Sequence, residues 1–140
     1  MPLESDEPLI PENLACEIAG LAPSKRRDWV KRGLLNQPTR RAKLSELQVV
    51  HLAIARELHD LLGPRDGGIV WLELQPLLAP QLPFAHFDMV VDLGYREVTV
   101  VTDPNEIPAL VRSGRPVRVI SFDELVSRVS GAFKRVAASK

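Results

Sequence analysis

The sequence has little of what several classes of protein require. It contains one cysteine, Cys16, which excludes a disulfide framework and a structural zinc site built on several thiolates. It has no run of roughly 18 apolar residues, so we expect no transmembrane helix. Residues 1–12 are acidic and contain prolines, unlike a signal peptide. These absences predict a cytoplasmic protein.

The chain also lacks net charge, because 18 acidic residues balance 18 basic ones. Apolar residues, in contrast, form 45% of its 140 residues, which is enough for a folded core. Its 12 prolines indicate short elements that are often interrupted. We therefore expect one compact domain or two very small ones. No cofactor is predicted.

Two short helices joined by a tight turn are predicted near the N-terminus. The first extends from Glu12 to Gly20, where the glycine ends it. The second covers Pro23–Arg32, with a proline at its first position and Gly33 as its C-terminal stop. Residues 1–11, which precede both helices, are expected to form a flexible lead-in.

A third helix is predicted to start at Ser45, which fits a capping box with Gln48. Apolar residues at spacings of three and four continue to Gly63-Pro64, where we expect the helix to end. Residues 65–68 (Arg-Asp-Gly-Gly) then predict a turn. The apolar segment 69–78 favours a short helix capped by Asp66 and broken near Pro76.

The last third of the chain changes character. Residues 87–92 and 96–101 predict a β-hairpin, residues 103–112 a short helix, and residues 116–122 a third strand. A final helix, capped by Asp123, is expected to extend to about Ala138. Residues 87–140 therefore predict a ββαβα unit, separated from a helical domain over residues 12–79 by a linker at residues 80–86.

Between residues 25 and 43 the chain is strongly basic. Only Asp28 opposes the eight basic residues of this segment, which are Lys25, Arg26, Arg27, Lys31, Arg32, Arg40, Arg41 and Lys43. Such a patch attracts polyanions whatever the net charge of the protein. A helix of the size of Pro23–Arg32 fits the DNA major groove, and the cations around it can neutralise phosphates.

The order of helices and the basic loop predict a winged helix-turn-helix. The overall fold class is then α+β, a winged helix-turn-helix followed by the ββαβα unit. Arg40, Arg41 and Lys43 form the expected wing against the DNA backbone or minor groove. The predicted DNA-binding residues are Ser24, Lys25, Arg27, Asp28, Trp29, Lys31, Arg32, Arg40, Arg41 and Lys43. Within this set the helical spacing places Trp29 on the inward face.

Residues 15–62 resemble the DNA-binding domain of the MerR family. The similarity lies in Gly20 before the turn, in Arg27 and Trp29 of the second helix, and in Gly-Leu-Leu at residues 33–35. A third helix led by serine, ending in Leu-Gly at residues 62–63, completes it. The resemblance implies a homodimer that binds a near-palindromic operator in duplex DNA and regulates transcription.

The chain departs from the family pattern at several positions. Arg26 stands where the family has an apolar residue, so we expect its stem to lie along the core while its charge reaches solvent, or the helix to be rotated. The wing lacks the tyrosine of the family. The metal-sensing cysteines and the long dimerisation helix are absent, so inducer sensing and promoter untwisting are not carried over.

The function predicted from the sequence is a sequence-specific, homodimeric transcription regulator. Dimerisation is assigned to the third helix or to the C-terminal sheet, and a toxin or RNA polymerase is a candidate protein partner. One alternative is the DNA-binding antitoxin of a toxin–antitoxin operon, whose C-terminal unit binds the toxin. Another is an accessory factor that bends DNA for recombination. An enzyme is the weakest interpretation, since no nucleophile, base and oxyanion donors come together in the sequence.

The isolated reactive residues have structural interpretations that we prefer. Cys16 is expected to be a small core residue rather than a reactive thiol. His51 and His59 are too far apart in sequence for a helical metal pair, and no carboxylate cluster accompanies them, so no metal site is predicted.

Overall fold

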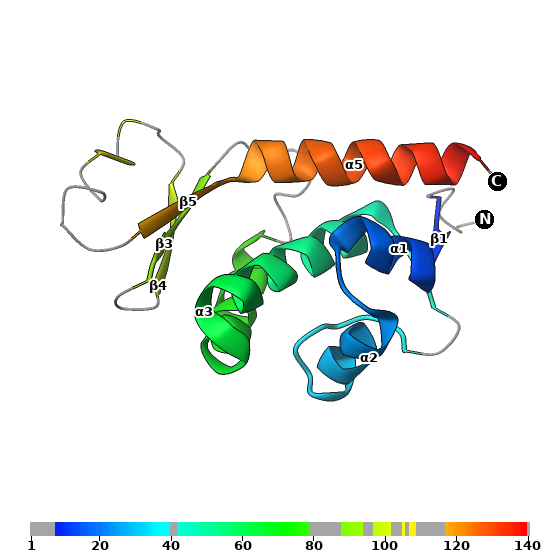
Figure 1. Ribbon diagram of the computed structural model, residues 1–140, viewed down its shortest axis with the longest axis horizontal. Helices are drawn as coiled ribbons and strands as arrows, with labels where there is room; N and C mark the ends of the chain where they lie inside the picture. Colours follow the sequence, from blue (N-terminus) through cyan, green and yellow to red (C-terminus); the bar gives the residue numbers. More distant parts are fainter. Residues whose placement is uncertain are drawn as a thin grey trace. The chain divides into compact units, whose positions relative to one another are not determined.

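A computed structural model describes residues 8–39, 42–78, 88–93, 97–101, 105, 107–108 and 117–139 (Figure 1). Contacts between residues divide the chain into an N-terminal unit, residues 1–53 with 129–140, and a sheet unit, residues 54–128. The domains predicted from the sequence, residues 12–79 and 87–140, remain a prediction. The predicted linker at residues 80–86 lies outside the described residues.

Helix α1 (Glu12–Ala19) has the predicted bounds. It ends at Gly20, whose φ of 87° lies in the left-handed region that glycine adopts without strain. The Gly20 N–H closes the helix by donating to the Cys16 carbonyl at 2.8 Å. Cys16 is buried together with Ala15 and Ala19, which confirms it as a small core residue.

Helix α2 (Pro23–Lys31) follows after a short turn and starts with the predicted proline. Gly33, with φ of 78°, follows the C-cap residue Arg32. Its N–H donates to the Val30 carbonyl at 3.0 Å, and the next N–H, that of Leu34, donates to the Trp29 carbonyl at 2.9 Å. These two bonds form a Schellman motif, so the glycine stop predicted from the sequence is confirmed.

A two-stranded antiparallel sheet joins β1 (Ile10–Pro11) to β2 (Lys43–Leu44). Ile10 pairs with Leu44, and neither side chain is accessible to solvent. Part of the segment predicted as a flexible lead-in is therefore ordered. The segment was predicted to be flexible because residues 1–11 are acidic and rich in proline. It nevertheless contains one β-branched apolar residue, Ile10, which packs in the core.

Helix α3 (Glu46–Leu78) begins at the predicted capping box. The Ser45 N–H donates to Gln48 Oε1 at 2.9 Å, and the Gln48 N–H donates to Ser45 Oγ at 3.2 Å. Each side chain thus satisfies a backbone donor that the first helical turn leaves without an intrahelical partner.

The predicted end of this helix at Gly63 is confirmed, because the non-helical backbone of Gly63 separates two helical segments of α3. Gly63 has φ 88° and ψ 167°, after which the chain resumes a helix that runs through Pro76 to Leu78. The turn predicted at residues 65–68 is therefore wrong, as are the cap at Asp66 and the break near Pro76. Gly67 lets two backbones approach closely: a Cβ there would lie 2.7 Å from the Leu58 carbonyl oxygen. A glycine at position 67 is therefore explained by the close packing of two helical segments rather than by a turn.

The three predicted C-terminal strands are confirmed as β3 (Asp88–Asp92), β4 (Glu97–Val101) and β5 (Val117–Ser121). They form an antiparallel sheet in the order β4-β3-β5, and the centre of β3 is buried. Together with the sheet of β1 and β2, this confirms a mixed α+β fold. Most of the helix predicted at residues 103–112 lies outside the described residues.

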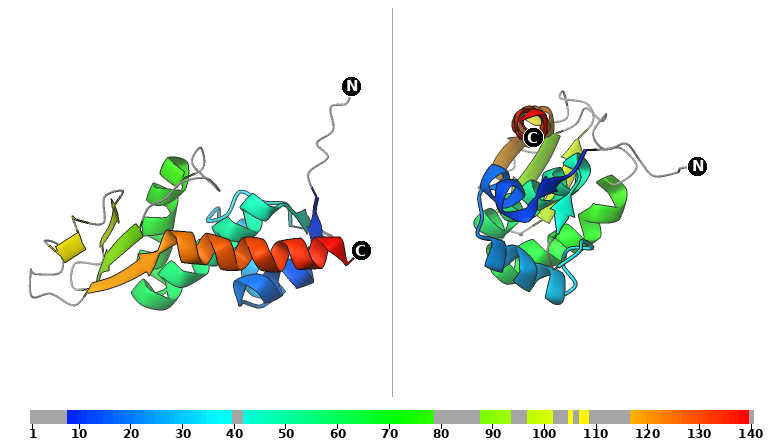
Figure 2. Two further views of the ribbon diagram at one scale, coloured as in Figure 1. Left: turned by 90° about the horizontal axis from the view of Figure 1, so that it is seen from above. Right: turned by 90° about the vertical axis from the view of Figure 1, so that its right-hand side faces the viewer.

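Strand β5 leads directly into helix α5 (Phe122–Ala138), drawn from orange to red in Figure 2. The cap differs from the prediction, because Ser121 Oγ, rather than Asp123, accepts a hydrogen bond, from the Glu124 N–H at 3.3 Å. Asp123 lies in the first turn, where its charge favours the positive end of the helix dipole. Among the described residues, no helix is long and apolar enough to cross a membrane.

We predict that Gly67→Ala lowers the free energy of unfolding by about 1–3 kcal/mol, because backbone atoms surround the added methyl group. Gly131 in α5 is the matched control: a Cβ there meets its nearest atom, a mobile Arg135 nitrogen, at 3.6 Å. Gly131→Ala should stabilise the protein by about 0.5–1 kcal/mol through helix propensity. Urea denaturation measures both changes, and equal effects would contradict the close approach at Gly67.

A second prediction concerns His51, whose pKa burial lowers to about 4. The unfolded chain binds a proton at this histidine near pH 6.5 and the folded chain does not, so stability falls as the pH drops from 6.5 towards 4. The loss over that window is on the order of 3 kcal/mol. The free energy of unfolding can be measured by denaturation between about pH 5 and pH 7.5, where carboxylates stay ionised. It should change less with pH for His51→Leu than for the wild type. Identical slopes would contradict this assignment.

Candidate nucleic-acid interface

Helix α2 presents one polar face and buries the other. Ser24, Arg27, Asp28 and Lys31, at spacings of three and four residues, are exposed. On the opposite side Trp29 is only 3% exposed. Trp29 is therefore a core residue, as its spacing indicated, and its inclusion among the predicted DNA-binding residues is corrected because a buried indole cannot reach a nucleic acid.

Arg26 is the second buried residue of α2, and it corrects another expectation. Its side chain is 0% exposed, so its charge does not reach solvent, and the helix need not rotate to expose it. Nε donates to Glu12 Oε2 at 2.9 Å, Nη1 to Gln37 Oε1 at 3.0 Å, and Nη2 to the Pro38 carbonyl at 2.6 Å. Each nitrogen of the guanidinium thus has an oxygen partner, which a buried arginine requires.

The partners of Arg26 connect four parts of the N-terminal unit. Glu12 opens α1, while Gln37 lies in the loop after α2. Gln37 Nε2 also donates to the Gln48 carbonyl at 3.0 Å, in the first turn of α3. The network therefore ties the starts of α1 and α3, the middle of α2 and the following loop to one charge.

The remaining basic residues of this segment that the structure describes are exposed: Lys25, Arg27, Lys31, Arg32 and Lys43. Two of them have acidic neighbours. Arg27 Nε lies 3.3 Å from Glu12 Oε2 with its side chain 49% exposed, and Arg32 Nε lies 3.2 Å from Asp28 Oδ2 with its side chain 66% exposed. Surface pairs of this kind are weak, so a polyanion can compete for both arginines.

The structure brings Lys43 of β2 to the same place as Arg27 of α2. Both line a shallow cavity of about 330 Å³, which Glu12 and Pro23 also border. Residues 16 positions apart in the sequence thus share one surface. Arg40 and Arg41, the other predicted residues of the wing, lie outside the described residues.

The described residues contain no group of three histidines, cysteines or carboxylates that could hold a metal ion. Burial raises the pKa of the Cys16 thiol to about 11, so it stays protonated at neutral pH. His59 Nδ1 lies 2.9 Å from the Ala55 carbonyl oxygen within the same helix. The buried Cys16 is therefore a packing residue, and the exposed cations are the main chemical feature of the described part of the N-terminal unit.

Comparison with known proteins gives no family: no protein-family model and no curated protein matches the chain.

Two adjacent arginines provide a test of the buried network. Arg26→Ala should lower the free energy of unfolding by about 3–5 kcal/mol, because it leaves the Glu12 carboxylate and Gln37 without their main partner. Arg27→Ala removes an exposed pair with the same carboxylate and should cost at most about 1 kcal/mol. Chemical denaturation measures both values. A loss for Arg26→Ala no larger than that for Arg27→Ala would contradict the role assigned to the buried guanidinium.

Proposed function

We propose that the N-terminal unit binds duplex DNA and that the protein is a homodimeric, sequence-specific transcription regulator of the cytoplasm. The observation that carries the proposal is the polarity of α2: its inward face is held by Arg26 and Trp29, while its outward face presents cations. A short helix of this kind, preceded by a helix and a tight turn, fits the major groove. The resemblance to the MerR family supports the same assignment.

Within this proposal the outward residues of α2 read base edges. Arg27 is suited to guanine, because its guanidinium can donate to O6 and N7 together. Ser24 and Asp28 lie on the same face and can donate to or accept from other bases. The Glu12 carboxylate, which contacts Arg26 and Arg27 through one oxygen, holds the Arg27 side chain near the helix start until DNA competes for it.

Exposed cations beside this face would contact phosphates. Lys25 and Arg32 flank the outward face of α2, and Lys43 lies beside Arg27 on the rim of their common cavity. Phosphate contacts orient a protein on DNA and contribute most of the sequence-independent affinity. Arg40 and Arg41 remain predicted members of this group.

The test is binding to an operator selected from random DNA with the purified protein. Arg27→Ala should weaken specific binding by about 1–3 kcal/mol and relax the preference at one base pair. Lys43→Ala should weaken specific and non-specific binding alike. It should also make the slope of the logarithm of the binding constant against the logarithm of the salt concentration less steep by about 1. Fluorescence anisotropy over a range of salt concentrations measures both effects.

Arg56→Ala is the matched control, because this partly exposed arginine of α3 pairs with Asp60 at 3.0 Å and lies outside α2. It should bind the operator like the wild type. Wild-type affinity of a folded Arg27→Ala variant would show that α2 does not read the bases. Binding that does not change with salt would exclude DNA as the ligand of the cationic face.

A further inference from the structure

Strand β5 has the features of a pairing edge. In the described part of the sheet it lies at one end of the order β4-β3-β5, with β4 at the other end, and it bonds only to β3. An edge strand presents backbone N–H and C=O groups that another strand can pair with. Val119, at the centre of β5, is 42% exposed, so its side chain is accessible to a partner strand.

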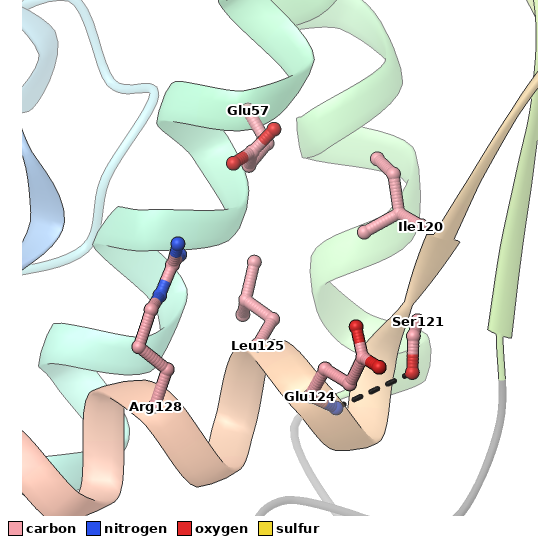
Figure 3. A pocket seen from close by; sticks show the side chains of 6 residues that line it. All are labelled: Glu57, Ile120, Ser121, Glu124, Leu125 and Arg128. Atoms are coloured by element: carbon pink, nitrogen blue, oxygen red, sulfur yellow. Dashed lines mark hydrogen bonds between the residues drawn. The ribbon is translucent and has the colours of Figure 1, made fainter.

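Two cavities adjoin this strand within the sheet unit. Glu57 and Leu61 of α3 border one of about 260 Å³ together with residues 118–120 of β5. The other, of about 230 Å³, lies at the end of β5 towards α5, and Figure 3 shows Ile120 and Leu125 directed into the space that Glu57 faces. Its remaining charged residues, Glu124 and Arg128, have opposite signs. Glu57 and Ile120 border both cavities, so a carboxylate lies beside the open strand.

We infer that β5 pairs with β5 of a second copy of this chain, antiparallel and centred on Val119. In this register Val119 faces its own equivalent across a two-fold axis, and Arg118 lies opposite Ile120 of the second copy. All five residues of the strand then pair. A contact of this kind is self-complementary, as the two-fold symmetry of most homodimers requires.

Neighbouring registers are less favourable for physical reasons. Centring on Arg118 would place two guanidiniums directly opposite each other, which is destabilising. Centring on Ile120 would extend the pairing to Phe122, where α5 begins. In the Val119 register Arg118 of each copy instead lies opposite Ile120 of the other copy. Arg118 is then close to the Glu57 that borders a cavity with that Ile120. Within one chain Arg118 already borders the same cavity as Glu57. In this register Arg118 of the second copy adds a further cation beside that carboxylate, and this charge complementarity, repeated twice by symmetry, favours a second copy as the occupant and Val119 as the centre.

The inference deepens the homodimer of the proposed function, since it names the surface through which two copies associate. It involves no residue of the cationic face on α2. Oligomeric state can be measured without DNA, so failure of the interface and failure of DNA binding are distinguishable. A DNA-binding monomer would reject the interface alone, and a dimer linked through β5 without DNA affinity would reject the proposed function alone.

The first experiment is disulfide formation in the full chain under mild oxidation. Val119→Cys should give a covalent dimer, because opposite residues of paired strands lie within the Cα separation that a disulfide spans. Val117→Cys is the matched control: it lies opposite residue 121 of the second copy and should not link to its own equivalent. Val117→Cys mixed with Ser121→Cys should link. Equal linkage of Val119→Cys and Val117→Cys would overturn the register.

The second experiment exchanges charges and follows the dimer by analytical ultracentrifugation. Arg118→Glu and Glu57→Arg should each raise the dissociation constant of the dimer about tenfold, since each creates two like-charge contacts. An equimolar mixture of the two variants should restore dimers, because each glutamate then meets an arginine. A monomeric wild type up to millimolar concentration, or no recovery in the mixture, would overturn the proposal.

Discussion

The guanidinium of Arg26 is a full positive charge in a place that solvent does not reach, and the N-terminal unit is organised around its neutralisation. Burial of such a charge costs several kcal/mol unless its donors are satisfied. Glu12, Gln37 and the Pro38 carbonyl meet this requirement from three different segments. None of these segments can move independently without leaving a charge or a polar group unpaired. The interaction thus constrains where α1, α2 and the loop after α2 lie.

The same constraint separates two neighbouring arginines into different roles. Arg26 and Arg27 both contact one oxygen of Glu12, yet the first is buried and the second is half exposed. Because Arg26 holds the inward face of α2, the outward face remains available to a ligand. A surface that is both cationic and rigidly oriented is what recognition of an extended polyanion requires. The proposed function depends on this division of the helix.

Local patterns anticipated a large part of the fold. The proline at the start of α2, the glycines that end α1 and α2, and the capping box at Ser45 were all readable, because each depends on residues within one helical turn. The three C-terminal strands were recognised from short segments that each contain two or more β-branched residues. The prediction at Gly67 failed, since a glycine required by two packed backbones has the same local context as one required by a turn.

The candidate site could be predicted in composition and less well in arrangement. The cationic segment was evident from the sequence, and its exposed members on α2 agree with helical spacing. The burial of Arg26 was missed, although one signal was available: a carboxylate, Glu12, at the start of the preceding helix can reach a charge on the inward face. The predicted wing placed Lys43 near the second helix, and Lys43 and Arg27 do border one cavity. The pairing of β1 with β2, which positions Lys43, was not predicted.

The amino-acid sequence by itself determined most helix ends, the positions of the three C-terminal strands, the presence of a single cysteine and the location of the positive charge, since these follow from short-range sterics and composition. Only the tertiary structure decided which arginine is buried, which glycine allows the two segments of α3 to approach each other, and which strands form the edges of the sheet. Those properties depend on contacts between residues that are not neighbours in the sequence. The residues next to a charge, a glycine or a strand do not indicate which partner it will contact.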